Sequence, residues 1–399
     1  MLTEIHKIII KLTSAAFLFA LFIGGHTLDY LLVLLLIGFV VVTATNKDFR
    51  FKSNMSLFVI IAFYLIHIVA SFYSENTDIA LFDLEVKASL LVFPLLFLFI
   101  SKTINKFKYA IIKAFIVISA SISFFLLSKA FYNFIITKEI SNIIYSNFSV
   151  LLHPSYYAMY LIFAIILSVY AYSKAICKNN IIPIISILIN LAALLLSDSK
   201  SGFFSAFIVF IYLLVSFLYK KSKSYTILSI VILLIFGGVL IKTNQRLQIM
   251  FNVTESYQKT ISNPNTYKES TGLRILSWNA TIDAIKENPI FGVGTGDIKP
   301  KLFKKYEELN YQKNIEIKMN VHNQFLETWL GQGIIGFVLL LLVFVIPFID
   351  AIKRKNIILQ TFLLLMFINF LFESMLNTQA GTIFFGFFYS FIVVVNYEE

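Results

Sequence analysis

The sequence predicts an all-α polytopic membrane protein with about twelve transmembrane helices and one long extramembrane loop between the ninth and tenth helices. The 399-residue chain is 58% hydrophobic and 14% charged, whereas soluble domains contain about 45–50% apolar and about 25% charged residues. Its apolar stretches also approach the roughly 20 residues that a helix needs to cross a bilayer. These two observations argue against a soluble multidomain enzyme and favour a single membrane domain over residues 1–399.

Twelve apolar stretches account for the predicted helices. They lie near residues 8–25, 29–45, 56–73, 84–101, 109–128, 153–172, 181–197, 202–219, 225–241, 331–351, 357–374 and 380–396. Residues 242–330, between the ninth and tenth stretches, form the only substantial extramembrane region. Within this loop, residues 274–288 have apolar side chains at helical spacing, and residues 299–313 have the pattern of an amphipathic helix.

The formal net charge of +11 has a topological explanation, because short cytoplasmic connections of membrane proteins are enriched in Lys and Arg. When the N-terminus is placed in the cytoplasm, 17 of the 33 Lys and Arg residues lie on the cytoplasmic side, and 12 of the other 16 lie in the long loop. The short connections therefore predict that both termini are cytoplasmic and that the long loop lies on the outer face. We expect no nucleic-acid partner, and the single Cys177 excludes a disulfide framework.

The strongest local motif closes the long loop and opens the tenth predicted helix. It runs from His322 to Glu327 and is followed by Gly331, Gly333 and Gly336. A His at a membrane–water boundary can act as a general base, because its unperturbed pKa is about 6.5. The glycines allow close packing against a neighbouring helix or a lipid-linked substrate. The alternative is an interfacial His that caps a helix, with glycines that serve packing alone.

A second motif combines Arg274 and Trp278 with a glycine-rich stretch, NPIFGVGTGD, at residues 288–297. Arg suits bidentate binding of phosphate oxygens and keeps its charge when it is partly desolvated. The stretch lacks both the P-loop pattern and the strand–glycine–helix context of dinucleotide sites, so an ATP site is not supported. We interpret it as a tight turn that brings the chain back to the membrane. Arg274 could also be a solvated loop charge.

Three smaller polar clusters are predicted to lie on the same outer face. Lys200, in the Ser-Asp-Ser-Lys-Ser-Gly turn between the seventh and eighth helices, could hold a phosphate as a point charge or could snorkel to the surface. Tyr156 begins the sixth helix, where the His-Pro start is also ordinary capping geometry. Glu373, Asn377 and Gln379 connect the last two helices and could bind sugar hydroxyls or form a simple polar connection.

These clusters predict a site at the outer ends of the helices and in the long loop. The topology is derived from Lys and Arg counts alone, and under it five separate polar clusters lie on one face of the membrane. Polar residues that merely snorkel to the surface would be spread over both faces. No His-x-x-x-His or Glu-x-x-His pair is present in the sequence. We therefore expect no metal ligand and no cofactor.

In this order, the motifs resemble the O-antigen ligase and O-antigen polymerase superfamily of bacterial polytopic glycosyltransferases. The resemblance covers roughly residues 150–345, and the twelve-span layout extends it over the chain. The matching residues are Ser199–Gly202, Gly272–Arg274 with Trp278, Asn288–Gly294, and His322 and Asn323 through Gly336.

The resemblance implies a glycosyltransferase of the bacterial inner membrane, with a periplasmic loop over a cavity that opens to the outer leaflet. It implies a glycan donor on undecaprenyl pyrophosphate, lipid A–core as the acceptor, and a reaction without ATP or metal. Arg274 would bind the pyrophosphate, and His322 would activate the acceptor hydroxyl. Lys200 stands where the family usually has an Arg, so a charge is kept but the bidentate fork is lost. The expected site residues are His322 as the catalytic residue and Arg274, Lys200, Asn323, Trp278, Tyr156 and Gln379 for substrate binding.

Three alternatives to a ligase remain at this stage. An O-antigen or exopolysaccharide polymerase would use the same donor class with another lipid-linked glycan as the acceptor. A protein O-oligosaccharyltransferase would use a protein hydroxyl. A transporter also fits polytopic helices, but transporters often show internal repeats and broken helices at the bilayer midplane, and neither is evident in this sequence.

Overall fold

The computed structural model describes residues 4–177, 179–218, 222–243, 248, 258 and 270–395. Within these residues the chain is helical and contains no β-strand, so the predicted all-α class is confirmed. By length and composition, seven of the described helices can cross a membrane, and four further apolar helices are shorter. These helices indicate a multi-pass membrane protein. Most of the predicted loop segment 244–269 lies outside the described residues.

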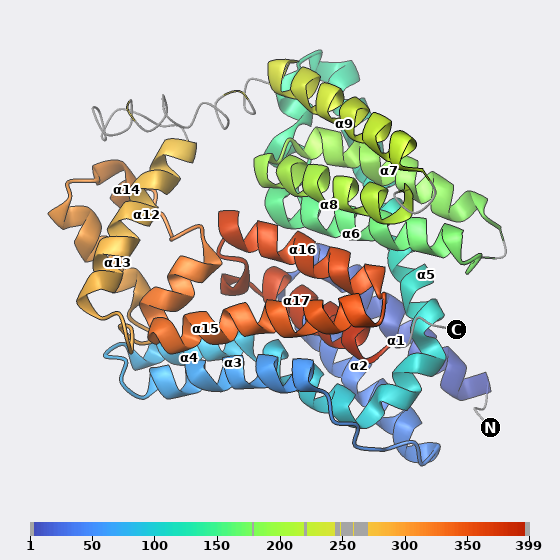
Figure 1. The fold of residues 1–399 in the computed structure, drawn as a ribbon, viewed down its shortest axis with the longest axis horizontal. Helices are drawn as coiled ribbons and strands as arrows, with labels where there is room; N and C mark the ends of the chain where they lie inside the picture. The colour runs from blue at the N-terminus through green and yellow to red at the C-terminus, as the bar shows by residue number, and fades with distance from the viewer. Residues whose placement is uncertain are drawn as a thin grey trace.

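The elements follow one another along the chain as shown by the colours and labels of Figure 1. They are α1 (Glu4–Ile23), α2 (Gly25–Thr45), α3 (Met55–Ser71), α4 (Thr77–Lys87), α5 (Ser89–Thr137), the short 3-10 helices η1 (Ile140–Ile143) and η2 (Tyr145–Asn147), α6 (Pro154–Ser173), α7 (Ile181–Ser197), α8 (Lys200–Leu218), α9 (Lys223–Thr243), α12 (Ser270–Glu287), α13 (Ile298–Glu308), α14 (Gln312–Glu316), α15 (Gln324–Lys353), α16 (Ile357–Phe372), η3 (Met375–Asn377) and α17 (Gln379–Val394).

Polar side chains fix where several of these helices begin. The side chains of Asn54, His153, Asn323, Asn356 and Thr378 accept hydrogen bonds from backbone N–H groups in the first turns of α3, α6, α15, α16 and α17. The first N–H groups of a helix have no partner within the helix, so such caps stabilise the start of a helix by about 1 kcal/mol. The predicted starts of these helices therefore agree with the structure to within a few residues, except for α15.

The fourth and fifth predicted spans differ from the structure. The predicted stretches 84–101 and 109–128 fall largely within one helix, α5, which is continuous over 49 residues, and the shorter α4 precedes it. The predicted connection, residues 102–108, contains neither Gly nor Pro, so nothing in its backbone chemistry interrupts the helix. The sequence therefore predicts two separate helices where the structure has one continuous helix.

Helix α17 is the buried centre of the membrane domain. Every residue from Gly381 to Val394 is buried, and the helix packs chiefly against α5 and α16. Its aromatic side chains contact rings on neighbouring helices: Phe384 stacks on Tyr160 at 4.2 Å between ring centroids, and Phe387 meets Phe93 edge-on at 5.2 Å. Much of the high Phe content therefore serves packing in the core.

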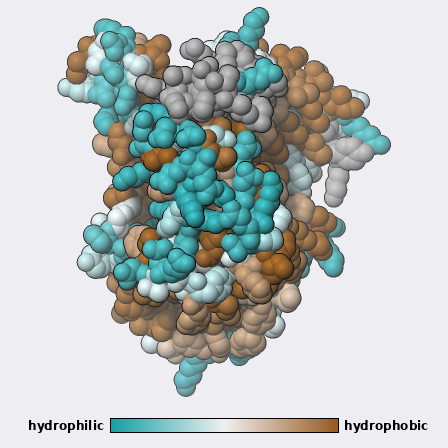
Figure 2. All heavy atoms as spheres, turned by 90° about the vertical axis from the view of Figure 1, so that its left-hand side faces the viewer, coloured by the Kyte–Doolittle hydropathy of each residue, from teal (hydrophilic) through white to brown (hydrophobic). Residues whose placement is uncertain are grey.

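Helices α12, α13 and α14 form a small extramembrane layer at one end of the molecule, and both chain termini lie toward the other end (Figure 1). The layer has its own apolar core, which includes Leu273, Ala280, Leu302 and Tyr306. Hydrophilic side chains gather on this end of the molecule, with hydrophobic surface around them (Figure 2). The predicted helix at 274–288 is present as α12, and the predicted amphipathic helix at 299–313 is divided into α13 and α14.

Candidate active site

Three glycines let the loop after α12 lie directly against the membrane helices. A Cβ atom on Gly292 would lie 2.5 Å from the carbonyl oxygen of Gly331, and one on Gly296 would lie 2.2 Å from that of Asn76. Gly294, between them, has a φ of +101° and meets a side chain at a similar distance. No larger residue fits such close backbone contacts. The alternating glycines therefore serve backbone packing, in agreement with a tight turn rather than a phosphate-binding loop.

Backbone hydrogen bonds join this loop to the start of α15. The Val293 N–H donates to the Leu330 carbonyl at 2.8 Å, and the Ile334 N–H donates to the Pro289 carbonyl at 3.0 Å. Helix α15 can receive the loop because its backbone is interrupted at Gly333, which has a φ of +65°. The glycines of the two predicted motifs thus meet each other, although about forty residues separate them.

The far end of the same loop is tied to the connection between α3 and α4. The Asp297 carboxylate accepts hydrogen bonds from the backbone N–H groups of Glu75 at 2.7 Å and Asn76 at 3.1 Å. The Thr295 hydroxyl donates to the carbonyl of His67 on α3 at 3.0 Å. These anchors fix the loop, and with it the end of α12, against the membrane domain.

Arg274, Glu373 and His322 form a connected group between three elements. Arg274 is on α12, Glu373 directly follows α16, and His322 lies one residue before the cap of α15. Nη2 of Arg274 lies 3.3 Å from Oε2 of Glu373, and Nδ1 of His322 lies 2.6 Å from Oε1 of the same carboxylate. The Glu373 side chain is only 6% exposed, whereas those of Arg274 and His322 are 19% and 21% exposed. The structure therefore joins the two main predicted residues through a buried carboxylate and leaves both partly accessible.

The electrostatics keep this carboxylate ionised. Burial, the largest single influence, would raise the pKa of Glu373, but the contact with His322 and the nearby side chains of Arg274 and His153 together hold that pKa below its ordinary value. Burial lowers the pKa of His153, and the charges of Arg274 and His322 lower it further, against an opposing influence from Glu373. His153 is therefore favoured in its neutral form beside the Arg274–Glu373–His322 group.

Helix α12 presents two buried donors without partners among the described residues. Nε of Arg274 and Nε1 of Trp278 are buried and make no hydrogen bond there. The two residues are four apart on a helix, which places them on the same face. A buried donor without a partner costs about 1–3 kcal/mol, so these atoms favour the presence of ligand or water oxygens.

Lys200 lies beside the beginning of the same helix. Its ammonium donates a hydrogen bond of 3.2 Å to the hydroxyl of Thr271, one turn before Arg274. Gly202 explains why this turn can approach the sixth helix: a Cβ there would lie 2.5 Å from the Cβ of Ala158 on α6. The structure thus places Lys200 and Arg274 along one side of α12.

The other predicted residues occupy more varied positions. Asn323 accepts hydrogen bonds from the N–H groups of Phe325 and Leu326 and so caps α15. Tyr156 is buried on α6, with its ring against Gly381, and its hydroxyl is influenced by the charge of Glu373. The amide of Gln379 donates to Asp29 on α2 at 2.9 Å. Tyr156 therefore lies near the Arg274–Glu373–His322 group, whereas the contact of Gln379 is with α2.

Glu373 and His153 are the members of the site that sequence reasoning missed. Glu373 was recognised only as one of several polar residues in a connection, and the His-Pro start of α6 was attributed to capping. An acidic residue at the end of an uncharged, largely apolar helix was the signal in the sequence, because an ionisable group near membrane depth is often functional. His153 does cap α6, through its Nδ1 atom, so the capping interpretation describes one of its contacts.

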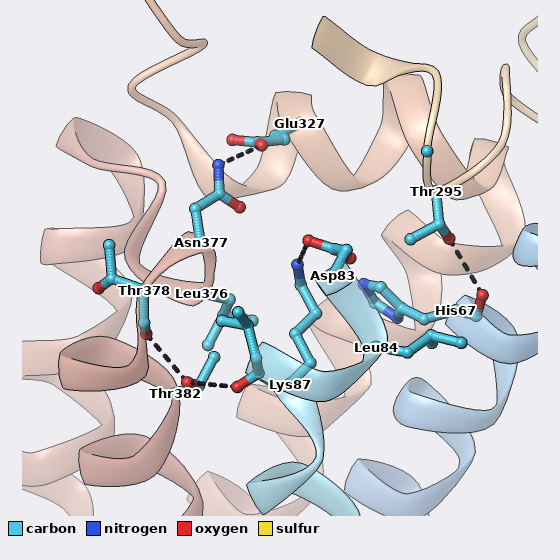
Figure 3. A network of polar contacts seen from close by, with 12 residues as sticks. His67, Asp83, Leu84, Lys87, Thr295, Glu327, Leu376, Asn377, Thr378 and Thr382 are labelled. Atoms are coloured by element: carbon cyan, nitrogen blue, oxygen red, sulfur yellow. Dashed lines mark hydrogen bonds and ion pairs between the residues drawn. The ribbon is translucent and has the colours of Figure 1, made fainter. Parts of the chain in front are cut away.

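A polar network joins the start of α15 to the connection between α16 and α17 (Figure 3). The Asn377 amide donates to the Glu327 carboxylate, and the backbone N–H of Leu376 donates to Gln324 at 2.8 Å. Both acceptors lie in the first turn of α15, immediately after His322. We call these two contacts the α15 latch, because they hold the connection that begins at Glu373 against the helix that begins after His322.

A buried ion pair lies beneath the latch. Lys87 on α4 donates to Asp83, and the Lys87 side chain is only 3% exposed. The Thr382 hydroxyl, at the start of α17, donates to the carbonyl of Val86 at 2.9 Å. Figure 3 shows Lys87 and Asp83 between Glu327 and His67. Among the described residues, no group of three or more His, Cys, Asp or Glu side chains is arranged to hold a metal ion.

Fold and site together define a multi-pass membrane protein with a charged site at the end that carries α12–α14. Comparison with known proteins gives a partial match: residues 185–341 are similar to the O-antigen ligase family, which supports the resemblance inferred from the motifs. The matched region runs from α7 into α15 and contains Lys200, Arg274 and His322.

The chain is also similar to a protein of Haemophilus influenzae that carries the description "Uncharacterized protein". The two are 26% identical over 197 residues, which is 49% of each chain. This chain therefore spans about half the length of the curated relative that it matches.

Proposed function

We propose that the protein is an O-antigen ligase-type glycosyltransferase, which moves a glycan from undecaprenyl pyrophosphate to lipid A–core at the periplasmic face of the inner membrane. The observation that carries this proposal is the Glu373 carboxylate, which contacts Arg274 with one oxygen and His322 with the other. An anion-binding side chain and a candidate base are thereby held in one partly accessible group. The O-antigen ligase family match supports the reaction class.

Arg274 has the chemistry to bind the donor pyrophosphate. Its guanidinium uses one nitrogen for Glu373, and its buried Nε has no hydrogen-bond partner among the described residues. Guanidinium groups bind phosphate oxygens through paired hydrogen bonds, and a cation there stabilises the charge that grows on the leaving group. Lys200, which contacts the first turn of the same helix, would add a second positive charge.

His322 has the chemistry to activate the acceptor. With Nδ1 lying 2.6 Å from Oε1 of Glu373, its Nε2 atom remains to take a proton. A carboxylate on one ring nitrogen fixes the tautomer and stabilises the charged imidazolium that forms, as in hydrolytic triads. The ionised state of Glu373 fits this role.

The proposed reaction is a direct displacement. The acceptor hydroxyl oxygen forms a bond to the anomeric carbon of the donor glycan while the bond from that carbon to the pyrophosphate oxygen breaks. The electron pair leaves with undecaprenyl pyrophosphate, and the hydroxyl proton moves to His322. The sugar–pyrophosphate bond supplies the driving force, so the reaction needs no ATP, and a single displacement inverts the anomeric configuration.

Reconstituted transfer tests the reaction and the site together. Purified protein would receive an undecaprenyl-pyrophosphate-linked glycan and lipid A–core, and product would be followed on gels. We expect His322→Ala to lower the rate by about 10²–10⁴-fold, the usual contribution of general-base catalysis, and Arg274→Ala to lower it strongly as well. Lys286→Ala, which removes an exposed cation from the same helix, is the matched control. Wild-type transfer by both site variants would refute the site.

Parallel reactions with the wild-type protein and different acceptors test which acceptor the protein uses. A second lipid-linked glycan in place of lipid A–core tests the polymerase alternative, and a protein with acceptor hydroxyls tests O-oligosaccharyl transfer. Transfer to lipid A–core alone supports the ligase. Elongation of the lipid-linked glycan, with none to lipid A–core, would replace the ligase by a polymerase while leaving the proposed roles of Arg274 and His322 in place.

A further inference from the structure

Two adjoining hollows lie at the end of the molecule that carries the chain termini, far from α12–α14. One has a volume of about 710 Å³ between the α2–α3 connection and the middle of α5, and the other, of about 420 Å³, lies between the start of α3 and the ends of α15 and α17. Lys52 and Ser101 line both hollows. We call the pair the terminal-side pocket.

Basic side chains converge on this pocket from three separate parts of the chain. They are Arg50 and Lys52 before α3, Lys102, Lys106 and Lys108 on α5, and Lys353 and Arg354 at the end of α15. Two carboxylates lie among them: Asp48 contacts Lys102 and Lys106, and Asp350 contacts Arg354. The pocket therefore keeps an excess of positive charge after these pairs are counted.

The basic segment before α3 is held in place rather than loosely solvated. The Arg50 N–H donates to the carbonyl of Phe99 at 3.0 Å, and the Lys52 N–H donates to that of Leu98 at 2.8 Å, both on α5. Charge in short loops is sufficient to orient a membrane protein. Membrane orientation alone does not require cations from distant segments to meet around one hollow. The hydrogen-bonded backbone of Arg50 and Lys52 also gives this hollow a defined structure.

The lining also contains hydroxyl and apolar groups in addition to cations. Ser53, Ser56 and Ser101 line the smaller hollow together with Ile346 and Val393. A soluble anion would use only the charged and polar groups. A phospholipid would place its phosphate against the cations and its acyl chains against the apolar helix ends, and basic pockets between transmembrane helices are known to suit such headgroups.

We propose that the terminal-side pocket binds the headgroup of an anionic phospholipid, with Arg50, Lys52 and Lys353 as the principal contacts to its phosphate. Lys102 and Lys106 stay paired with Asp48 and shape the floor of the site. The lipid joins the start of α3, the middle of α5 and the ends of α15 and α17, and so stabilises the membrane domain. This site lies at the opposite end from Arg274 and His322, so it does not depend on the proposed glycosyl transfer.

Native mass spectrometry of the full-length protein tests the proposal with defined lipids. Protein stripped of lipid in detergent would be offered phosphatidylglycerol, phosphatidylcholine or soluble glycerol 3-phosphate. We expect the wild-type protein to retain phosphatidylglycerol in preference to the other two and to unfold at a higher temperature when it is bound. Equal retention of phosphatidylcholine, or equal binding of glycerol 3-phosphate, would overturn the proposal in favour of unspecific lipid or a soluble anion.

Matched charge variants then locate the binding. The triple variant Arg50→Gln, Lys52→Gln, Lys353→Gln should lose phosphatidylglycerol binding, because each cation contributes about fivefold to affinity for an anionic lipid. The control triple variant Lys11→Gln, Lys174→Gln, Lys223→Gln removes the same charge elsewhere on the predicted cytoplasmic side and should bind as the wild type does. The single exposed Lys52→Gln, which leaves the fold intact, should weaken binding about fivefold. Equal losses in both triple variants would overturn the pocket.

Discussion

Glu373 is the residue that turns two separate sequence motifs into one site. Arg274 and His322 lie 48 positions apart, on an extramembrane helix and before a membrane helix. Both contact the same buried carboxylate, which follows a third helix. Because the Glu373 carboxylate contacts both Arg274 and His322, these two side chains keep a fixed distance and orientation relative to each other. The proposed division of labour between pyrophosphate binding and proton transfer depends on that relation.

Replacing the carboxylate tests this relation. Glu373→Gln keeps the shape but removes the charge that faces Arg274 and His322, so we expect kcat for glycan transfer to fall by about 10²-fold or more, toward the value of the His322→Ala variant. Steady-state rates with the lipid-linked donor would measure it. A variant with kcat within twofold of the wild type would show that Glu373 has no part in the reaction.

The same residue predicts a pH dependence of stability. Because the folded-state pKa of Glu373 lies below its ordinary value, its pairs with Arg274 and His322 stabilise the protein above that ordinary value, and the contribution is lost as the pH falls through the lowered pKa. The wild-type unfolding temperature should therefore drop more steeply than that of Glu373→Gln when the pH is lowered below about 4.5. Parallel curves for the two proteins would contradict this expectation.

Sequence reasoning identified the two ends of this site but not its centre. Arg274 and His322 occur in motifs that carry their own chemical signal, a cation near a glycine-rich turn and a His at a helix start. Glu373 carries only the general signal of an acidic residue at the end of an apolar helix, and its contacts with Arg274 and His322 arise only because α16 ends beside α12. Asn323 was expected to bind substrate, and in the structure its side chain also caps α15, a contact that the same sequence pattern predicts equally well.

At the scale of elements, close backbone packing decides where the extramembrane layer is placed. The break in α15 at Gly333 and the glycines of the 288–297 loop bring two backbones together. Sequence reasoning treated the two glycine groups as separate features, because nothing in local spacing shows that they contact each other. It likewise divided α5 into two spans at a cluster of Lys residues, since charge marks a membrane boundary but does not break a helix.

Gly333 provides the sharpest test of this packing. In Gly333→Ala, the added Cβ would lie 2.0 Å from the carbonyl oxygen of Ile290, at a φ of +65°. With its ψ of −165°, this backbone conformation is essentially restricted to Gly and costs another residue about 1–3 kcal/mol, and the clash adds to that cost. We expect a clear fall in the thermal unfolding temperature or in the yield of folded protein on gel filtration.

Gly238→Ala is the matched control for that substitution. A Cβ at Gly238, on α9, meets no atom within 4 Å, and Ala is the better helix former by about 1 kcal/mol. Its unfolding temperature should equal or exceed that of the wild type. If Gly333→Ala were as stable as Gly238→Ala, the packing of the 288–297 loop on α15 would have to be different from that described.

The α15 latch gives a second prediction for an element. Glu327→Ala removes the acceptor for the Asn377 amide, whereas Glu327→Gln keeps an acceptor oxygen and loses only the charge. Removing one partner of a buried hydrogen bond costs about 1–3 kcal/mol, so we expect Glu327→Ala to lower both stability and kcat, and Glu327→Gln to restore most of each. Unfolding temperatures and transfer rates measured side by side would show this order. Equal loss in the two variants would show that the charge of Glu327, rather than its contact with Asn377, matters.

At the scale of the whole molecule, charge is divided between two ends with different surroundings. One end carries α12–α14 and the Arg274–Glu373–His322 group, and the other carries the chain termini and the terminal-side pocket. The apolar lengths were sufficient to predict a multi-pass membrane protein, and the Lys and Arg distribution predicts which of the two ends is cytoplasmic. They could not predict which cations pair with Asp48 or Glu373, because those pairs depend on how distant helices pack.

The polarity itself is open to a direct test. If the termini are cytoplasmic, an exposed position on α12 faces the periplasm, and positions after α6 and α15 face the cytoplasm. In a Cys177→Ser background, we expect Lys286→Cys to react with a membrane-impermeant maleimide in intact cells. Lys174→Cys and Lys355→Cys should react only after the membrane is opened, because a charged reagent cannot cross the hydrocarbon layer. The reverse pattern would place the Arg274–Glu373–His322 group in the cytoplasm, where a periplasmic transfer could not use it.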